Sequence, residues 1–197
     1  LNPDLPGKGK GIPVMDYLHN TVGVSEEDTK KMNEEIAELA KENGVKSNLE
    51  NAIAANSLDA HRLIKLAATK GLSSKVMSLL SKAYFEEAKD YSDHKILTEI
   101  GTTAGLDKKE IKKLLSGDDY AYEVKQDIQE ANNLEFDTVP TFLFNRKHAL
   151  VGSQPVGAFL KTLQKAFFKW QRQDLKQNGE VDVTKGKSCS TDGTCDI

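Results

Sequence analysis

The sequence predicts a mixed α/β protein in which a long all-helical block precedes a short strand–strand–helix unit. Over residues 13–133 apolar residues recur at helical spacing between capping residues and glycines. Residues 136–151 then carry short runs of β-branched and aromatic residues. A helical pattern resumes at Pro155. These three observations together define the fold class.

Composition excludes several classes of function. The chain has 197 residues, of which 38% are hydrophobic and 29% charged, and the net charge of −3 comes from interleaved acidic and basic residues. The sequence has no cluster of basic residues that would favour nucleic-acid binding. It also has no run of 18 apolar residues that would favour a membrane as a partner. Dinucleotide, phosphate-loop and nucleophile-elbow motifs are absent from the sequence, as are histidine pairs with metal-ligand spacing. We therefore expect no cofactor and no metal.

The first two segments are a loop and a long helix. Residues 1–12 contain Pro and Gly in loop proportions, and Leu1-Asn2-Pro3 is interpreted as the end of a strand. Ser25 followed by Asp28 predicts a capped helix start, and Gly44 predicts its end. The segment 45–53 is ambiguous, with a short extended piece as one interpretation.

Further helices fill the rest of the block. Asn56 or Ser57 is expected to cap the next helix, which Gly71 ends, and later helices are predicted from residue 73, over 95–104 and over 107–115. A last helix is predicted to start at Asp118 or Asp119. We interpret 13–133 as one helical insertion domain.

The segment Phe136–Asn145 begins the strand unit. Proline cannot donate to a sheet ladder, so Pro140 at the start of a strand needs a positional reason, and a cis Val139–Pro140 bond is one such reason. A tight connection, a second strand over 149–152 and a helix from Pro155 to about residue 176 follow. Strand, tight connection, strand and helix form the closing half of a thioredoxin-like sheet, assigned to 134–177. Residues 178–197 are polar and are predicted to be a flexible tail.

These segments also carry a family resemblance. Besides the Val139-Pro140 segment, it rests on Leu1-Asn2-Pro3-Asp4, Ala54 to Leu63, Ala83 to Glu87 and Gly152-Ser153-Gln154-Pro155. Together they resemble the DsbA family, and within it the FrnE-like oxidoreductases, up to about Phe168. The resemblance implies a thioredoxin-like fold with a helical insertion. It also implies a thiol–disulfide oxidoreductase acting on protein disulfides or dithiols. Because cysteines are scarce, a cytoplasmic location is expected.

One departure from the family dominates. The family's catalytic Cys-x-x-Cys lies at the start of its first helix, upstream of the segment that matches Leu1. The present sequence has two cysteines, Cys189 and Cys195, and neither belongs to such a motif. We expect that the opening strand and helix, roughly 30 residues by the usual size of such units, are missing together with the reactive centre.

The resemblance suggests four substrate-binding residues, Asn56, His61, Val139 and Pro140. Val139 and Pro140 would lie beside the dithiol, where outward-facing backbone groups let an extended substrate pair with the strand edge. His61 would face the same cleft, and an imidazolium there would lower a cysteine pKa. The alternatives are a trans proline, a locally packed His61 and an Asn56 that only caps its helix.

The two cysteines form a candidate auxiliary redox pair. Five residues separate Cys189 from Cys195, and Asp192-Gly193 favours a turn that lets the sulfurs meet. Without nearby histidines a zinc site is not expected. The alternative is two exposed thiols with no assigned role.

Two other functions stay open at this point. Kappa-class glutathione transferases and hydroxychromene-carboxylate isomerases share the insertion architecture, and with them glutathione would be a partner. A non-catalytic binding module is the third possibility. The residues upstream of Leu1 would separate the first two, since Cys-x-x-Cys favours exchange and a lone Ser favours the transferase.

Overall fold

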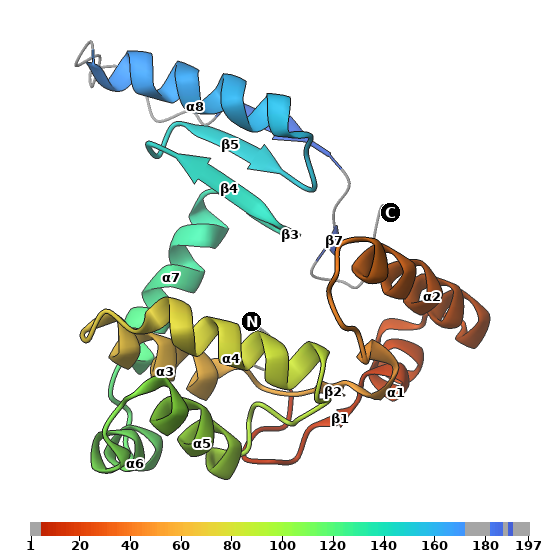
Figure 1. The fold of residues 1–197 in the computed structure, drawn as a ribbon, viewed down its shortest axis with the longest axis vertical. Helices are drawn as coiled ribbons and strands as arrows, with labels where there is room; N and C mark the ends of the chain where they lie inside the picture. The colour runs from red at the N-terminus through yellow and green to blue at the C-terminus, as the bar shows by residue number, and fades with distance from the viewer. Residues whose placement is uncertain (1–4, 172–181, 187–188, 191–197) are drawn as a thin grey trace. The chain divides into compact units, whose positions relative to one another are not determined.

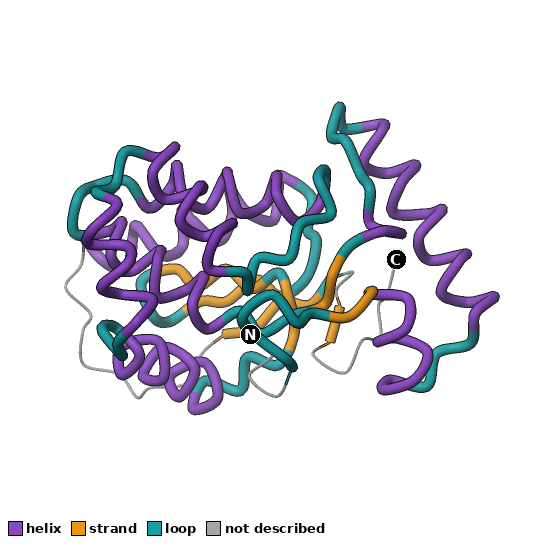
Figure 2. Tube along the Cα trace, turned by 90° about the horizontal axis from the view of Figure 1, so that it is seen from below, coloured by secondary structure: helices purple, strands orange, loops and turns teal. Residues whose placement is uncertain are grey.

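The computed structural model describes residues 5–171, 182–186 and 189–190. The chain divides into two compact units, 1–128 and 129–197 (Figure 1). The division falls within α7 (Ala121–Asn133), slightly before the end of the predicted insertion at residue 133. Helices dominate over short strands in the tube view (Figure 2). Each unit is described by itself below.

The first unit opens with a segment enclosed by a two-stranded ladder. Strand β1 (Ile12–Pro13) pairs antiparallel with β2 (Ile53–Ala54). Between them lie α1 (Val14–Tyr17), the π-helix η1 (Leu18–Val22), α2 (Glu26–Glu42) and the 3₁₀ helix η2 (Leu49–Asn51). The ambiguous segment 45–53 therefore contains both a helical turn and the start of a strand.

The predicted cap of α2 is confirmed. The Ser25 side chain accepts a hydrogen bond from the Asp28 backbone N–H at 3.1 Å and donates one to the Asp28 carboxylate at 2.6 Å. This satisfies one of the amide groups that every helix start leaves unpaired. Gly44 follows the helix with φ +68°, the left-handed conformation that ends helices.

The main core of the first unit lies among four helices. These are α3 (Leu58–Ala68), α4 (Ser73–Phe85), α5 (His94–Ala104) and α6 (Lys108–Ser116). Their fully buried side chains include Leu63, Val76, Leu97, Ile111 and Leu114. The buried residues of each helix recur three or four positions apart, as expected for helices with one face toward a core.

Glycine permits the close approach of α5 to α6. A Cβ atom at Gly101 would lie 2.6 Å from Cδ1 of Ile111 and 3.3 Å from Cδ1 of Leu63. Both distances are shorter than ordinary van der Waals contacts, so the Ile111 side chain would have to move to admit a larger residue at this position.

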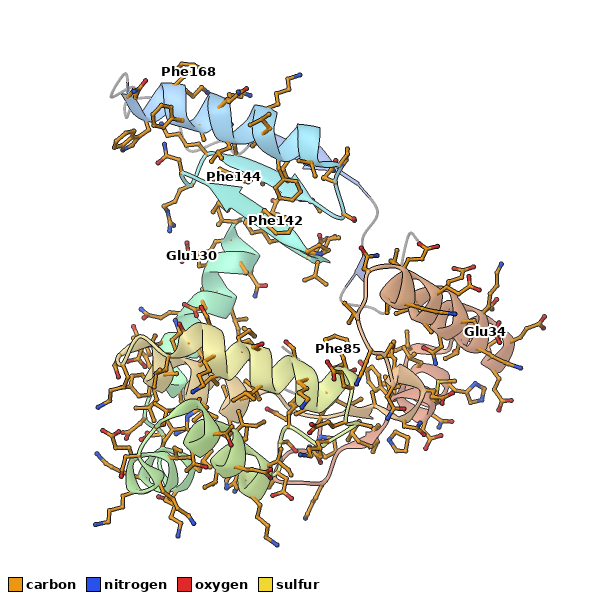
Figure 3. All side chains as sticks on the ribbon, viewed as in Figure 1. Glu34, Phe85, Glu130, Phe142, Phe144 and Phe168 are labelled. Atoms are coloured by element: carbon orange, nitrogen blue, oxygen red, sulfur yellow. The ribbon has the colours of Figure 1, made fainter. Side chains whose placement is uncertain are left out.

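The second unit contains a three-stranded sheet covered by a helix. Strand β4 (Thr141–Phe144) pairs antiparallel with β5 (His148–Val151), and β5 pairs parallel with β6 (Asp182–Lys185). Helix α8 (Val156–Gln171) packs on β4 and β5 (Figure 1). The Phe159 ring of α8 makes T-shaped contacts with Phe142 and Phe144, at 4.9 Å and 6.4 Å between ring centroids. Figure 3 labels Phe142 and Phe144 on β4.

A second, two-stranded ladder joins distant parts of this unit. Strand β3 (Thr138–Val139) pairs antiparallel with β7 (Cys189–Ser190). The sequence predicts a flexible tail over 178–197, yet two segments of it form strands. The physical reason is that strand pairing satisfies backbone groups regardless of side-chain polarity, so a polar sequence does not reveal it.

Helix α8 also exposes a large apolar surface. Val156, Leu160, Leu163, Phe167, Phe168 and Trp170 are all exposed, and Figure 3 labels Phe168 on this helix. Among the described residues, no helix is long and apolar enough to cross a lipid bilayer.

Candidate functional site

The turn at Val139–Pro140 lies between strands β3 and β4. Its peptide bond is cis, as the sequence predicts. Two hydrogen bonds hold the turn: the Thr141 hydroxyl donates to the Thr138 carbonyl at 2.6 Å, and the Gly152 amide donates to the Pro140 carbonyl at 2.8 Å. Val139 itself is 59% exposed. The turn is thus fixed from inside the unit while its first residue faces solvent.

The backbone edge of β3 takes an antiparallel partner. Val139 lies opposite Cys189, and Thr138 lies opposite Ser190. Within the described ranges β3 is paired with β7 alone, in a ladder separate from the β4–β5–β6 sheet. Cys195, the second half of the predicted redox pair, lies outside the described residues.

The segment Gly152–Gln154 organises the surroundings of the turn. Gly152 has φ +80°, which favours glycine, and its amide holds Pro140. The Gly186 amide donates to the Val151 carbonyl at 2.7 Å, directly after β6. A Cβ atom on Gly186 would collide with the Ser153 carbonyl and the Gln154 side chain. This segment therefore supports both the turn and the end of the parallel strand.

The structure places Asn56 at the start of α3. Its side-chain oxygen accepts a hydrogen bond from the Leu58 backbone N–H at 2.9 Å, while the Asn56 backbone N–H donates to the Pro6 carbonyl at 3.0 Å. Ser57 occupies the N-cap position but makes no capping hydrogen bond through its side chain. Asn56 thus performs the capping that the sequence assigned to one of these two residues.

His61 lies half-buried on α3, one turn before Lys65. Burial lowers the pKa of His61 below its ordinary value of 6.5, and the positive charge of Lys65 acts in the same direction, whereas Asp127 opposes it. Lys65 and Asp127 themselves form an ion pair at 2.6 Å. His61 is therefore mainly neutral near pH 7, which weakens the interpretation of this residue as an imidazolium that activates a thiol.

Arg62 is buried and holds α3 to the end of α6. Its guanidinium donates to the carbonyls of Leu114 at 2.6 Å, Gly117 at 2.8 Å and Asp119 at 2.8 Å. It also pairs with the Asp59 carboxylate at 2.7 Å. A cation placed on the last carbonyls of a helix is stabilising. The sequence carries no signal for this role, because the three carbonyls lie more than 50 residues away along the chain.

Asp59 connects this network to a further helix. Its second carboxylate oxygen lies 2.8 Å from Nε2 of His94, at the start of α5. Beside His94, an open cavity of about 550 Å³ lies along α5 and α6 and is lined in part by Lys95, Lys108 and Lys112. Among the described residues that line it, none is Asn56, His61, Val139 or Pro140. The described residues include no group of three or more His, Cys, Asp or Glu arranged to hold a metal ion.

The proposed site residues fall in both units. Asn56 and His61 belong to the first unit, and Val139, Pro140 and Cys189 belong to the second. Contacts within the second unit bring Cys189 next to Val139. Asn56 lies two residues before α3, and His61 lies in the first turn of this helix.

Comparison with known proteins decides the family. The family model of the DSBA-like thioredoxin domain matches residues 4–164. The chain belongs to the DSBA-like thioredoxin domain family. A solved structure of a probable DsbA oxidoreductase from Streptomyces coelicolor is similar, with 25% sequence identity and a TM-score of 0.78. That similarity covers 100% of this chain and 80% of the Streptomyces chain. No curated protein sequence matches the chain significantly.

Family membership confirms the fold class predicted from the sequence. The DSBA-like thioredoxin fold is mixed α/β and mostly helical, as the two units are. The matched range includes Asn56, His61, Val139 and Pro140 and ends before the two cysteines. The role of the cysteine pair therefore finds no support in the family match.

Proposed function

We propose that this protein is a thiol–disulfide oxidoreductase of the FrnE-like subgroup, acting on protein or peptide disulfides and dithiols. The observation that carries the proposal is the match of residues 4–164 to the DSBA-like thioredoxin domain. The similarity to the Streptomyces coelicolor structure supports it. A Cys-x-x-Cys outside these 197 residues supplies the reactive dithiol in this proposal, since the sequence contains none.

The exposed apolar surface of α8 is consistent with a further strand and helix that carry the dithiol. Apolar side chains exposed along one helix mark a surface that another element or partner covers. On α8 these residues include Leu160, Phe167 and Trp170. In the proposal, the strand and helix that carry the dithiol cover part of this surface.

The chemistry is a two-step exchange. A thiolate of the dithiol attacks one sulfur of the substrate disulfide, forms a mixed disulfide and releases the other substrate sulfur as a thiolate. The second cysteine of the dithiol then attacks the mixed disulfide, so the substrate leaves fully reduced and the enzyme dithiol becomes a disulfide. The reverse sequence oxidises a substrate dithiol.

Residues of the present chain bind and orient the substrate. The backbone of β3 offers an edge to which an extended peptide pairs, at Thr138 and Val139. Asn56 fixes the start of α3 through its bond to Leu58. We assign His61 a packing role rather than thiolate activation, because its pKa is lowered by burial. With two cysteines in 197 residues, we place the protein in the cytoplasm.

Reduction of insulin by dithiothreitol tests the proposal. Three proteins are compared: the product of the complete gene that encodes this sequence, the 197-residue chain, and that chain with Cys189→Ser and Cys195→Ser. We expect the complete product to accelerate insulin precipitation and the doubly substituted chain to match the rate without protein. The unsubstituted chain measures what the tail cysteines contribute.

Two outcomes would contradict the proposal. If the doubly substituted chain accelerated reduction as much as the complete product, a Cys-x-x-Cys could not be the reactive group. If the complete product were inactive toward insulin but bound glutathione in calorimetry, the glutathione-dependent alternative would replace the oxidoreductase.

A further inference from the structure

The chain's own tail is paired with the backbone edge that the proposed function assigns to substrate. Strand β7 consists of Cys189 and Ser190 and runs antiparallel to β3, with Cys189 opposite Val139. A cysteine within an extended segment, held on this edge, has the features of the peptide that an oxidoreductase of this kind would bind. The segment resembles a substrate supplied by the protein itself.

The tether to this segment is short. Strand β6 is anchored in parallel to β5 up to Lys185, and the Gly186 amide donates to the Val151 carbonyl at 2.7 Å. Three residues separate Lys185 from Cys189. A short link gives a tethered segment a millimolar effective concentration at its site, so even a weak pairing is populated.

The pairing is also small enough to be displaced. Antiparallel neighbours alternate between hydrogen-bonded and non-bonded pairs, so a ladder of two residue pairs holds one doubly bonded pair. Each such bond contributes little in water, and together they correspond to roughly a tenfold preference. The Val139 side chain on β3 is 59% exposed although the strand is paired, so burial of this side chain does not lock the pairing in place.

We propose that the segment at Cys189–Ser190 occupies the β3 edge as a displaceable strand, and that an extended, cysteine-containing peptide competes with it for Thr138 and Val139. This inference rests on the proposed function for the identity of the peptide. It adds that substrate access is regulated by the chain itself. Occupation by the tail lowers the affinity for peptides until a competing strand displaces it.

The experiment removes the tail strand without shortening the chain. The test variant carries Cys189→Pro and Ser190→Pro, which eliminates both backbone donors, so the bonded pair is broken whichever one it is. The matched control carries Cys189→Ser and Ser190→Ala, which keeps both donors. Both variants also carry Cys195→Ser, so no disulfide exchange occurs. The probe is a fluorescent peptide with the sequence of residues 186–193 and Ser at position 189.

Two measurements are made on each variant. Fluorescence anisotropy should show at least tenfold tighter binding of the probe to the proline variant than to the control. Hydrogen exchange followed by NMR should identify which of the Thr138 and Val139 amides is protected in the control. That amide should exchange at least fivefold faster in the proline variant than in the control. Probe affinities within twofold of each other would overturn the proposal, and so would unchanged exchange.

Saturating the control with the probe gives an independent test if the proline variant does not fold. Exchange at the residue 189 and 190 amides should then accelerate as the probe displaces the tail, and no acceleration at saturation would overturn the proposal. Neither measurement requires redox turnover. A failed insulin assay would therefore reject the oxidoreductase, while these data would still decide whether the tail competes for the edge.

Discussion

At the residue scale, the best-defined interactions of this protein are structural. Arg62 makes four polar contacts from a buried position, three of them to backbone carbonyls and one to Asp59. Removal of such a group leaves the buried Leu114 carbonyl without this partner and also breaks three part-buried hydrogen bonds, which costs more than the loss of an exposed pair. The neighbouring His61 differs in that burial lowers its pKa.

Replacing Arg62 tests this network. We expect Arg62→Ala to lower the free energy of unfolding by about 3 kcal/mol or more, as measured by urea denaturation. Arg62→Lys should recover only part of the loss, because an ammonium cannot reach several carbonyls in the fork geometry of a guanidinium. Lys70→Ala, which removes the exposed pair with Glu110, is the control and should cost about 0–1 kcal/mol. Equal losses in the two alanine variants would refute the role of Arg62.

The lowered pKa of His61 predicts how stability depends on pH. The unfolded chain takes up the His61 proton at about pH 6.5, whereas the folded chain does so only at lower pH. Stability is therefore fully present above pH 6.5 and falls as the pH drops below it. We expect His61→Gln to flatten the loss of unfolding free energy between pH 7.5 and 5.

A second variant works in the opposite direction. Asp127 raises the pKa of His61, so Asp127→Asn should lower it further and steepen the loss of stability toward acid. Urea denaturation at a series of pH values measures both slopes. A His61→Gln slope identical to that of the unsubstituted chain would show that His61 is not the responsible group.

At the scale of elements, glycine sets the packing of α5 on α6. Alanine at a helix interior is ordinarily favoured over glycine by about 1 kcal/mol. At Gly101 the added methyl would lie 2.6 Å from Cδ1 of Ile111, and overpacking of this kind costs about 1–3 kcal/mol. The two effects oppose each other, and the packing term is the larger.

We therefore expect Gly101→Ala to destabilise the protein despite its higher helix propensity. Thermal unfolding should show a lower Tm for this variant and a partial recovery when Ile111→Val, which removes the colliding atom, is added. Gly157→Ala on α8 is the matched control, because nothing lies within 4 Å of its added Cβ. It should leave Tm unchanged or slightly raised. A Gly101→Ala protein as stable as the control would contradict the close packing.

Some elements were predictable from local sequence patterns, and others depend on tertiary contacts. Local signals predicted α2 from Ser25 and Gly44 and a helix over 107–115 where α6 lies, because caps and helical spacing act over a few residues. The β4–β5 pair was predicted from two short apolar runs that a tight connection separates, which is also a local pattern. Strands β6 and β7 were missed, since their partners lie more than 30 residues away in the sequence.

At the scale of the whole molecule, the sequence by itself determined the fold class, the order of the helices and the turn at Val139–Pro140. The fold class and the helix order follow from periodicity and caps, which are properties of neighbouring residues, whereas the cis bond was predicted from proline at a strand start together with the family resemblance. The candidate site at Val139 and Pro140 came from the family resemblance, which also rests on short segments of sequence.

Only the tertiary structure decided the remaining features. It showed that Arg62 is buried beneath α6, that His61 has a lowered pKa, and that Cys189 lies opposite Val139. Each depends on atoms brought together from distant parts of the chain. Burial and strand pairing are set by those neighbours, and the local sequence carries no signal for them.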